Sequence, residues 1–163
     1  MKTYLRELET AKKAALLAGE AIMEVYSKND FKIENKSDNT PLTEADKKAN
    51  DIIIKLLKTD FPGYAILSEE SENDQSRMDN ELCFIVDPLD GTKEFIKRNG
   101  QFTVNIALSH NNKSVLGVIY APVTKELYFA AENYGAYCTA QDDSTVRLKV
   151  SERTENVRMV MSL

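Results

Sequence analysis

"FIVDPLDGTKEF", residues 84 to 95, is the stretch that sets the succession of elements in the middle of this chain. An apolar run ends at Val86, and Asp87 and Pro88 follow directly. Proline presets φ at the second position of a tight turn, and Asp at the first position accepts hydrogen bonds from the turn amides. Gly91 then opens a short helical pattern. We therefore predict a buried strand, a turn at its carboxyl end and a short helix.

A turn accounts for Asp87 and Pro88, but it does not require the second carboxylate, Asp90. Two carboxylates this close repel each other unless a positive group lies between them. Hard divalent cations take oxygen ligands, and Mg²⁺ is usually held by one or two carboxylates together with substrate phosphate. The amides of Gly91 and Thr92, at the start of a helix, suit a phosphate group. The stretch therefore predicts a combined metal and phosphate site.

Two amphipathic helices are predicted before this stretch. Residues 2 to 27 carry apolar side chains at helical spacing. Gly19 inside that pattern weakens a helix by roughly 1 kcal/mol relative to alanine, so it indicates close packing. After a polar segment rich in turn formers, Thr43 is a suitable N-cap for a second helix, and Asp46 lies in its first turn. That helix is expected to end before Pro62.

The apolar pattern becomes strand-like after the second helix. Short runs of this kind lie at residues 64–67, 82–86, 102–109, 114–123, 126–132, 135–139 and 145–150. Alternation in "FTVNIALS" predicts one buried face, made of Phe102, Val104, Ile106 and Leu108, and a second face with Thr103, Asn105 and Ala107. Short connections make neighbouring strands antiparallel. The expected fold class is α+β, with two N-terminal helices packed on a mostly antiparallel sheet of about six strands.

Composition narrows the class of protein. The chain has 163 residues, enough for one domain, and its net charge of −5 argues against a nucleic-acid surface. It shows no signal pattern and no apolar run long enough to span a membrane. Cys83 and Cys138 lie too far apart for a thiolate zinc motif, so we expect free thiols and a cytoplasmic protein. The single histidine, His110, is interpreted as a turn residue.

Two further carboxylates draw attention by their positions. Glu69 belongs to "LSEES", directly after the strand-like run at 64–67, and Asp46 lies in the first turn of the second helix. Each has an ordinary explanation, as part of a solvated acidic loop or as a side chain that complements the helix dipole. With Asp87 and Asp90, however, all four lie at ends of regular elements, where functional residues tend to gather.

Three segments together resemble a known family. "DPLDGTKEFIKRNGQFTVNIAL", "LSEES" and "PLTEAD" resemble the inositol monophosphatase-like superfamily of Mg²⁺-dependent, lithium-sensitive phosphatases. Within it, "GTKEF" is similar to the bacterial CysQ-type 3′(2′),5′-bisphosphate nucleotidases, whereas inositol monophosphatases more often continue "GTTNF". The resemblance extends over essentially the whole chain. It implies the N-terminal half of a layered αβαβα fold.

The resemblance also implies a metal site with two or more Mg²⁺ ions. Glu69 would ligate one ion and hold the attacking water, and Asp87 would bridge two ions. The backbone carbonyl of Leu89 would complete part of the first ion's shell, and Asp90 would ligate the second. Of these residues, Glu69, Leu89 and Asp90 would also contact the substrate.

The phosphate and the nucleophile are assigned by the same resemblance. The amides of Gly91 and Thr92 would hold phosphate oxygens. The Thr92 hydroxyl, paired with Asp46, would orient the nucleophilic water and help to deprotonate it. Lys36, in the loop before the second helix, is a candidate for approaching the phosphate, although a solvent-facing lysine is the simpler interpretation.

One feature of the family is missing from this chain. Such enzymes have a second, α/β half with a further metal-binding aspartate in a "WDxAAG"-like stretch, and this chain contains no tryptophan. Its last residues, "VRMVMSL", look like the start of a strand with more protein to follow, and a final edge strand is the alternative. We therefore expect residues 1–163 to be the N-terminal metal- and phosphate-binding domain, with weak Mg²⁺ binding and little turnover when tested alone.

Three functions remain open at this stage. The first is removal of the 3′-phosphate from adenosine 3′,5′-bisphosphate, with its sulfated form as an additional substrate. The second is the same chemistry on an inositol or sugar phosphate. The third is a catalytically inactive fragment or interaction domain that keeps the fold. The expected partner is a small nucleotide bisphosphate, with no nucleic acid and no transmembrane segment. Peripheral association with the cytoplasmic side of a membrane is left open, and no oligomeric state is predicted.

Overall fold

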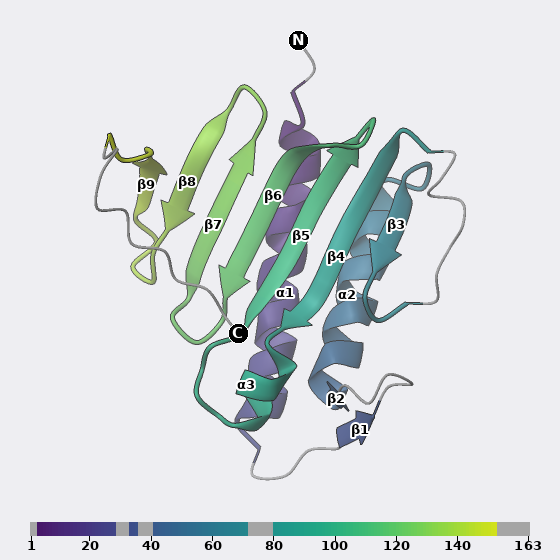
Figure 1. Ribbon diagram of the computed structural model, residues 1–163, viewed down its shortest axis with the longest axis vertical. Coiled ribbons are helices and arrows are strands. Elements are labelled where there is room, and N and C mark those ends of the chain that lie inside the picture. The colour runs from purple at the N-terminus through teal and green to yellow at the C-terminus, as the bar shows by residue number, and fades with distance from the viewer. Residues whose placement is uncertain (1–2, 29–32, 36–40, 72–79, 153–163) are drawn as a thin grey trace.

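The computed structural model describes residues 3–28, 33–35, 41–71 and 80–152. Two long helices, α1 (Leu5–Tyr26) and α2 (Glu44–Asp60), lie against one face of a seven-stranded sheet (Figure 1). A short helix, α3 (Thr92–Ile96), follows the second strand of that sheet. The strands of the sheet are β3 (Ala65–Ser68), β4 (Leu82–Asp90), β5 (Thr103–His110), β6 (Lys113–Ala121), β7 (Glu126–Ala131), β8 (Gly135–Thr139) and β9 (Thr145–Leu148). The α+β class is therefore confirmed.

The strands follow one another in chain order across the sheet, from β3 to β9. All neighbours are antiparallel except β3 and β4, which are parallel. This exception has a physical reason, since parallel neighbours need a long connection and β3 and β4 are separated in sequence by residues 69–81. The sheet has seven strands where about six were expected.

A second, two-stranded sheet was not predicted. The strands β1 (Ile33–Asn35) and β2 (Pro41–Thr43) pair antiparallel just before α2. Both lie in the polar segment that sequence composition marked only as rich in turn formers. Three-residue strands are too short to show the alternation of apolar and polar residues that identifies a strand. The sequence pattern therefore did not predict this pair of strands.

The start of α2 is built as the sequence predicts. Thr43 is the N-cap, and its hydroxyl accepts a hydrogen bond from the Ala45 amide over 3.2 Å. Asp46 completes a capping box, because its Oδ2 atom accepts a hydrogen bond from the Thr43 amide over 2.8 Å. Such a cap stabilises a helix by about 1 kcal/mol. It also holds Asp46 in one orientation from the first turn onward.

The core lies between the two long helices and the sheet. On β5 the predicted alternation is confirmed, since Phe102, Val104, Ile106 and Leu108 are all at most 3 % exposed. Burial of each such side chain contributes about 1.5–3 kcal/mol. Gly19 of α1 lies against Tyr120 of β6 so closely that an added Cβ would come within 2.3 Å of the ring. The close packing expected at Gly19 is therefore present.

The predicted turn after Val86 is wrong. The strand β4 continues to Asp90, with Asp87 opposite Asn105 and Asp90 opposite Thr103 of β5. Three steps along β4 thus correspond to two steps along β5, which is a β-bulge. Proline has no N–H to donate to a ladder, and a bulge is one of the few places where a strand tolerates it. The "DP" pair that indicated a turn instead marks this bulge.

His110 is not a turn residue either, because it is the last residue of β5. Its Nδ1 atom lies 2.5 Å from the hydroxyl of Tyr4, next to the start of α1, and its Nε2 atom lies 3.8 Å from the Glu81 carboxylate. The side chain therefore joins the first helix to the sheet. Cys83 and Cys138 are free thiols, as expected.

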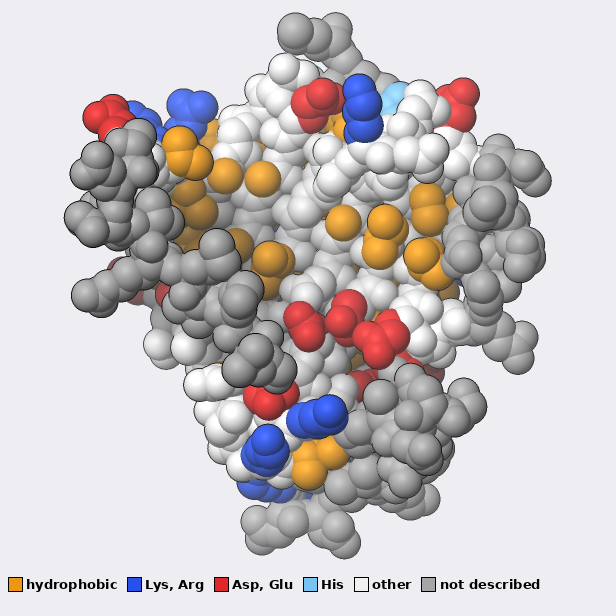
Figure 2. Space-filling view, viewed as in Figure 1, with side chains coloured by type: hydrophobic (Ala, Val, Ile, Leu, Met, Phe, Trp, Pro, Cys, Tyr) orange, Lys and Arg blue, Asp and Glu red, His pale blue; other side chains and the backbone are white. Residues whose placement is uncertain are grey.

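The second face of the sheet is apolar, and no helix in the described ranges covers it. In-register pairing lines up one straight row across all seven strands: Leu67, Ile85, Ala107, Gly117, Ala130, Ala136 and Leu148. The four central positions of that row are alanine or glycine, so the row is low in the middle and higher at the edges. Figure 2 shows hydrophobic side chains spread across this open face.

Candidate active site

A buried hydrogen-bond network joins the start of α2 to the start of α3. Asp46 is fully buried, and its Oδ2 atom accepts hydrogen bonds from the Thr43 amide and, over 2.5 Å, from the Thr43 hydroxyl. Its Oδ1 atom accepts a hydrogen bond from the Thr92 hydroxyl over 3.1 Å. The Thr92 Oγ1 atom also lies 3.3 Å from the Leu89 carbonyl oxygen. A hydroxyl has one proton and two lone pairs, so Thr92 can donate to Asp46 and still accept a hydrogen bond from water.

Gly91 is required at its position for two reasons. Its φ is +95°, in the left-handed region that residues with a side chain rarely adopt. A Cβ added there would also lie 2.8 Å from the Gln101 carbonyl oxygen. The Gly91 carbonyl accepts a hydrogen bond from the Phe95 amide over 2.9 Å, which closes the first turn of α3. The sequence analysis gave another reason for glycine here, namely that the backbone can approach a phosphate closely. That role stays a prediction.

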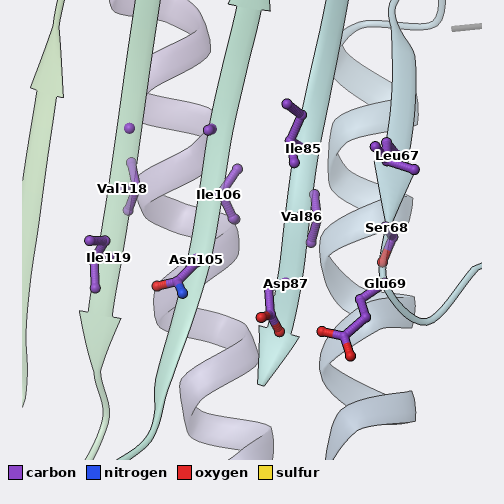
Figure 3. Close-up of a pocket in the computed structure, with 12 residues that line it drawn as sticks. Leu67, Ser68, Glu69, Ile85, Val86, Asp87, Asn105, Ile106, Val118 and Ile119 are labelled. Atoms are coloured by element: carbon purple, nitrogen blue, oxygen red, sulfur yellow. The ribbon is translucent and has the colours of Figure 1, made fainter. Parts of the chain in front are cut away.

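Glu69 is placed beside β4 by the backbone. It follows the last residue of β3, and its amide donates a hydrogen bond to the Val86 carbonyl over 3.1 Å. Its side chain projects toward that of Asp87 at the end of β4 (Figure 3). Two segments that are separate in sequence therefore bring their carboxylates together at one edge of the open face.

The Asp87 carboxyl is partly buried and lies close to two other acidic side chains. Burial raises the pKa of the Asp87 carboxyl to about 7, with further contributions from the charges of Glu69 and Asp90. A hydrogen bond from the Leu89 amide acts in the opposite direction and lowers that pKa. Among the described residues the buried Oδ1 atom of Asp87 has no hydrogen-bond partner. A bound cation or a proton would therefore satisfy this carboxylate oxygen.

The donor set suits Mg²⁺ better than it suits zinc. It consists of the Glu69, Asp87 and Asp90 carboxylates and the nearby Leu89 carbonyl, all of them oxygen donors. In the described ranges no three His, Cys, Asp or Glu side chains converge into a group that could hold a metal ion by themselves. Mg²⁺ does not need such a cage, because it takes one or two protein carboxylates and fills its shell with water and phosphate oxygens. The residues present therefore fit this ion.

Two polar residues of β5 belong to the same site, although they were not among the predicted site residues. The Asn105 side-chain amide donates a hydrogen bond to Asp90 Oδ2 over 3.0 Å. The Thr103 hydroxyl donates a hydrogen bond to Asn105 Oδ1 over 3.1 Å. The signal was available, since both are polar residues on the face of the strand opposite to the core. The sequence did not show that these two residues lie opposite Asp87 and Asp90 of β4.

A hollow of about 620 Å³ extends from these carboxylates along the open face. Its polar end is formed by Glu69, Asp87 and Asn105, which lie at the same level on three neighbouring strands or strand ends (Figure 3). Apart from Ser68, its remaining lining is apolar and includes Leu67, Ile85, Ala107, Gly117 and Ile119. Figure 2 shows the acidic side chains gathered below the hydrophobic ones, with lysine or arginine side chains next to them. The site is thus acidic at its centre and apolar on one side.

Some expectations are not tested by this arrangement. Lys36 lies outside the described residues, so its approach to the phosphate stays a prediction. The assignment of each ligand to a particular metal ion stays a prediction too.

In the described part of the chain no helix is long and apolar enough to cross a membrane.

Comparison with known proteins identifies a family and several relatives that this chain resembles. Residues 5–162 match the family described as the inositol monophosphatase family. The 3′(2′),5′-bisphosphate nucleotidase CysQ of Salmonella typhimurium is 49 % identical over 127 residues, which are 77 % of this chain and 52 % of that protein. The chain therefore spans about half the length of this curated relative.

Solved structures agree with the sequence comparison. The crystal structure of CysQ from Bacteroides thetaiotaomicron superposes with a TM-score of 0.76 at 42 % identity, covering 92 % of this chain and 60 % of that one. The suhB protein of Bartonella henselae gives a TM-score of 0.80 at 35 % identity, covering 91 % and 55 %. Both likenesses extend over nearly all of this chain and over little more than half of the other.

Proposed function

The chain belongs to the inositol monophosphatase family, and on that premise we propose that it forms the metal- and phosphate-binding half of a Mg²⁺-dependent phosphatase. The proposed reaction removes the 3′-phosphate from adenosine 3′,5′-bisphosphate to give AMP and phosphate. The observation that carries the proposal is the Thr92–Asp46 hydrogen bond beside the Glu69, Asp87 and Asp90 carboxylates. Phosphate-ester hydrolysis needs a group that orients water and a site that attracts cations, and this hydroxyl and this acidic edge suit those two tasks.

The cation is the first part of the proposal. Glu69, Asp87, Asp90 and the Leu89 carbonyl would hold Mg²⁺, with two or more ions in a complete site. When bound, Mg²⁺ lowers the pKa of coordinated water and neutralises charge on phosphate oxygens. The Oδ1 atom of Asp87 supports this assignment, because it is a buried carboxylate oxygen near other carboxylates and no described residue donates a hydrogen bond to it.

The nucleophile is the second part. The Thr92 hydroxyl donates a hydrogen bond to Asp46, and its lone pairs can then accept a hydrogen bond from a water molecule. Asp46 is held by two hydrogen bonds from Thr43, so it does not turn toward solvent. The water oxygen attacks phosphorus in line with the ester bond and gives up one proton toward the Thr92–Asp46 pair. The bond from phosphorus to the 3′-oxygen breaks, and the 3′-oxygen takes up one proton from solvent. No covalent enzyme intermediate is involved.

Phosphate placement is the third part. The amides of Gly91 and Thr92 would hold two phosphate oxygens, next to the hydroxyl that orients the water. The left-handed conformation of Gly91 supports this role, because it directs the backbone from β4 into α3 within a single residue. The acceptor hydroxyl and the phosphate-binding amide then belong to the same residue, Thr92.

The identity of the substrate rests on the relatives and not on the hollow. The relative from Salmonella is named a 3′(2′),5′-bisphosphate nucleotidase, and the "GTKEF" sequence at residues 91–95 agrees with that group. A panel of adenosine 3′,5′-bisphosphate, its 5′-phosphosulfate analogue and inositol monophosphate separates the candidates when applied to a version extended to the length of the relatives.

Calorimetric titration with Mg²⁺ tests the proposed site on the chain itself. We expect measurable binding to the unmodified chain and loss of that binding in Asp87→Asn. Asp142→Asn is the matched control, because it makes the same chemical change at an exposed turn outside the site. A chain that binds no Mg²⁺, or that binds equally well after Asp87→Asn, would be a scaffold without this function.

A further inference from the structure

Asn105 holds two parts of the acidic edge in one place. In the β4–β5 ladder its backbone lies opposite Asp87, before the bulge, while its side chain donates a hydrogen bond to Asp90 Oδ2, after the bulge. We propose that Asn105 is a positioning residue that fixes Asp90 relative to Asp87 so that the two carboxylates can share cations. This inference rests on the proposed function, since it concerns the same Mg²⁺ site.

The orientation of the Asn105 amide follows from its neighbours. An ionised Asp90 accepts hydrogen bonds but cannot donate them, so only the Nδ2 end of the amide can face it. The Oδ1 end then faces Thr103, whose hydroxyl donates to it over 3.1 Å. The reversed amide would set its carbonyl oxygen against a carboxylate oxygen. Thr103, Asn105 and Asp90 therefore form a chain of donors and acceptors with a single favourable direction.

The bulge explains why an anchor is needed. Pro88 and Leu89 separate the two carboxylates, and the ladder changes register there. A strand alone would set the spacing of side chains rigidly, but the backbone through a bulge is left without its regular pairing. Asp90 is exposed at this point. The hydrogen bond from the Asn105 side chain to Asp90 therefore links β5 to β4 at the bulge, where regular backbone pairing is interrupted.

The chemistry of the amide is suited to this position. Asn105 lies at the polar end of the hollow with Glu69 and Asp87 (Figure 3). An aspartate there would have a similar shape, but it would add a fourth negative charge and would face Asp90 with an acceptor. A leucine would fill the space without any donor. Only a neutral side chain with a donor orients Asp90 without changing the charge of the site.

The test is a Mg²⁺ titration followed by calorimetry, applied to the chain and to four variants. Asn105→Leu is expected to weaken Mg²⁺ binding by about tenfold or more, the usual effect of removing a residue that orients a metal ligand. Thr103→Val, which leaves Asn105 in place but removes its orienting donor, is expected to give a smaller loss in the same direction. Asn105→Asp separates shape from hydrogen bonding, and we expect it to weaken binding as well. Asp87→Asn serves as the variant without a site.

A purely structural role for Asn105 predicts a different pattern. Melting temperatures would fall in Asn105→Leu and Thr103→Val, while the Mg²⁺ dissociation constant of the folded protein would stay as in the unmodified chain, and that result overturns the inference. If Asn105→Leu does not fold, Thr103→Val decides by the same criterion. The proposed function fails separately, when the unmodified chain and Asp87→Asn behave alike. Binding that is lost in Asp87→Asn but unchanged in all the β5 variants rejects only the role of Asn105.

Discussion

The Thr92 hydroxyl donates a hydrogen bond over 3.1 Å to Asp46, a residue 46 positions earlier in the chain. This single contact connects the capped start of α2 with the start of α3. It also ties the helix layer to the end of β4, the strand that carries Asp87 and Asp90. The contact therefore helps to hold the parts of the proposed site together, and its contribution to the free energy of unfolding can be measured.

Removing the Thr92 donor should destabilise the fold. In Thr92→Val the buried Asp46 keeps its two hydrogen bonds from Thr43 and loses the third. Leaving a buried carboxylate short of a donor lowers the free energy of unfolding by about 1–3 kcal/mol. Urea denaturation followed by circular dichroism measures the change. Thr92→Ser keeps the donor and should stay within about 0.5 kcal/mol of the unmodified chain. A loss in Thr92→Ser without a loss in Thr92→Val would mean that the threonine methyl group, and not the hydrogen bond, is what matters.

Stability should depend on pH through Asp87 when no metal is present. Its pKa is about 7 in the folded chain and near its ordinary value of 3.8 when unfolded, so protonation favours the folded state. The stabilising contribution is fully present below pH 4 and is lost as the pH rises through 7. Melting temperatures in chelator-containing buffers between pH 4.5 and 8 measure this loss.

Asp87→Asn provides the comparison, because asparagine imitates the protonated carboxyl at every pH. The variant should gain stability relative to the unmodified chain as the pH rises from about 4.5 to 8. Asp142→Asn should show no such growing difference, since that aspartate lies in an exposed turn and its pKa is lowered by the hydrogen bonds of Ser144. A flat difference for Asp87→Asn would show that its carboxyl is already ionised at pH 4.5.

Gly91→Ala should be strongly destabilising. An alanine in the left-handed conformation costs about 1–2 kcal/mol, and here its Cβ would also lie 2.8 Å from the Gln101 carbonyl oxygen. We expect a loss of at least 2 kcal/mol by urea denaturation. Gly63→Ala is the matched control, because an added Cβ at Gly63 would meet no atom within 4 Å. A neutral Gly91→Ala would mean that the backbone at residue 91 can adopt another conformation.

The hollow on the open face should bind an apolar dye. Ile119 lines it and is 47 % exposed, so Ile119→Gln should clearly reduce the fluorescence of added anilinonaphthalene sulfonate. Leu5→Gln is the control, because Leu5 is 42 % exposed but belongs to α1, on the other side of the sheet. Equal reductions would show that the dye responds to overall exposure of apolar groups and not to this hollow.

Local patterns predicted the features that depend on near neighbours. Thr43 and Asp46 form a capping box because both are within one helical turn of each other. The alternation from Phe102 to Leu108 predicted the buried face of β5 because side chains of a strand point to alternate sides. The Asp87, Asp90 and Glu69 carboxylates were identified by their positions after apolar runs. These signals need no information about which strand lies next to which.

The failures have the opposite origin. "DPLDG" matches a tight turn, yet pairing with β5 extends β4 through it and converts the turn into a bulge. His110 was expected in a turn after an apolar strand, but it is the last residue of β5 and contacts Tyr4 at the start of α1. In both cases a distant segment supplied hydrogen bonds that outweighed the local preference.

The amino-acid sequence alone was therefore enough to identify the α+β class, the two long helices, the acidic candidates and the likeness to a family of phosphatases. Only the tertiary structure placed Thr92 against Asp46 and Asn105 against Asp90. Helix caps and strand alternation are encoded within a few residues, whereas contacts between α2, β4 and β5 depend on strand register. Register is set by pairing and packing over the whole sheet, and one shifted residue at the bulge decides which side chains meet.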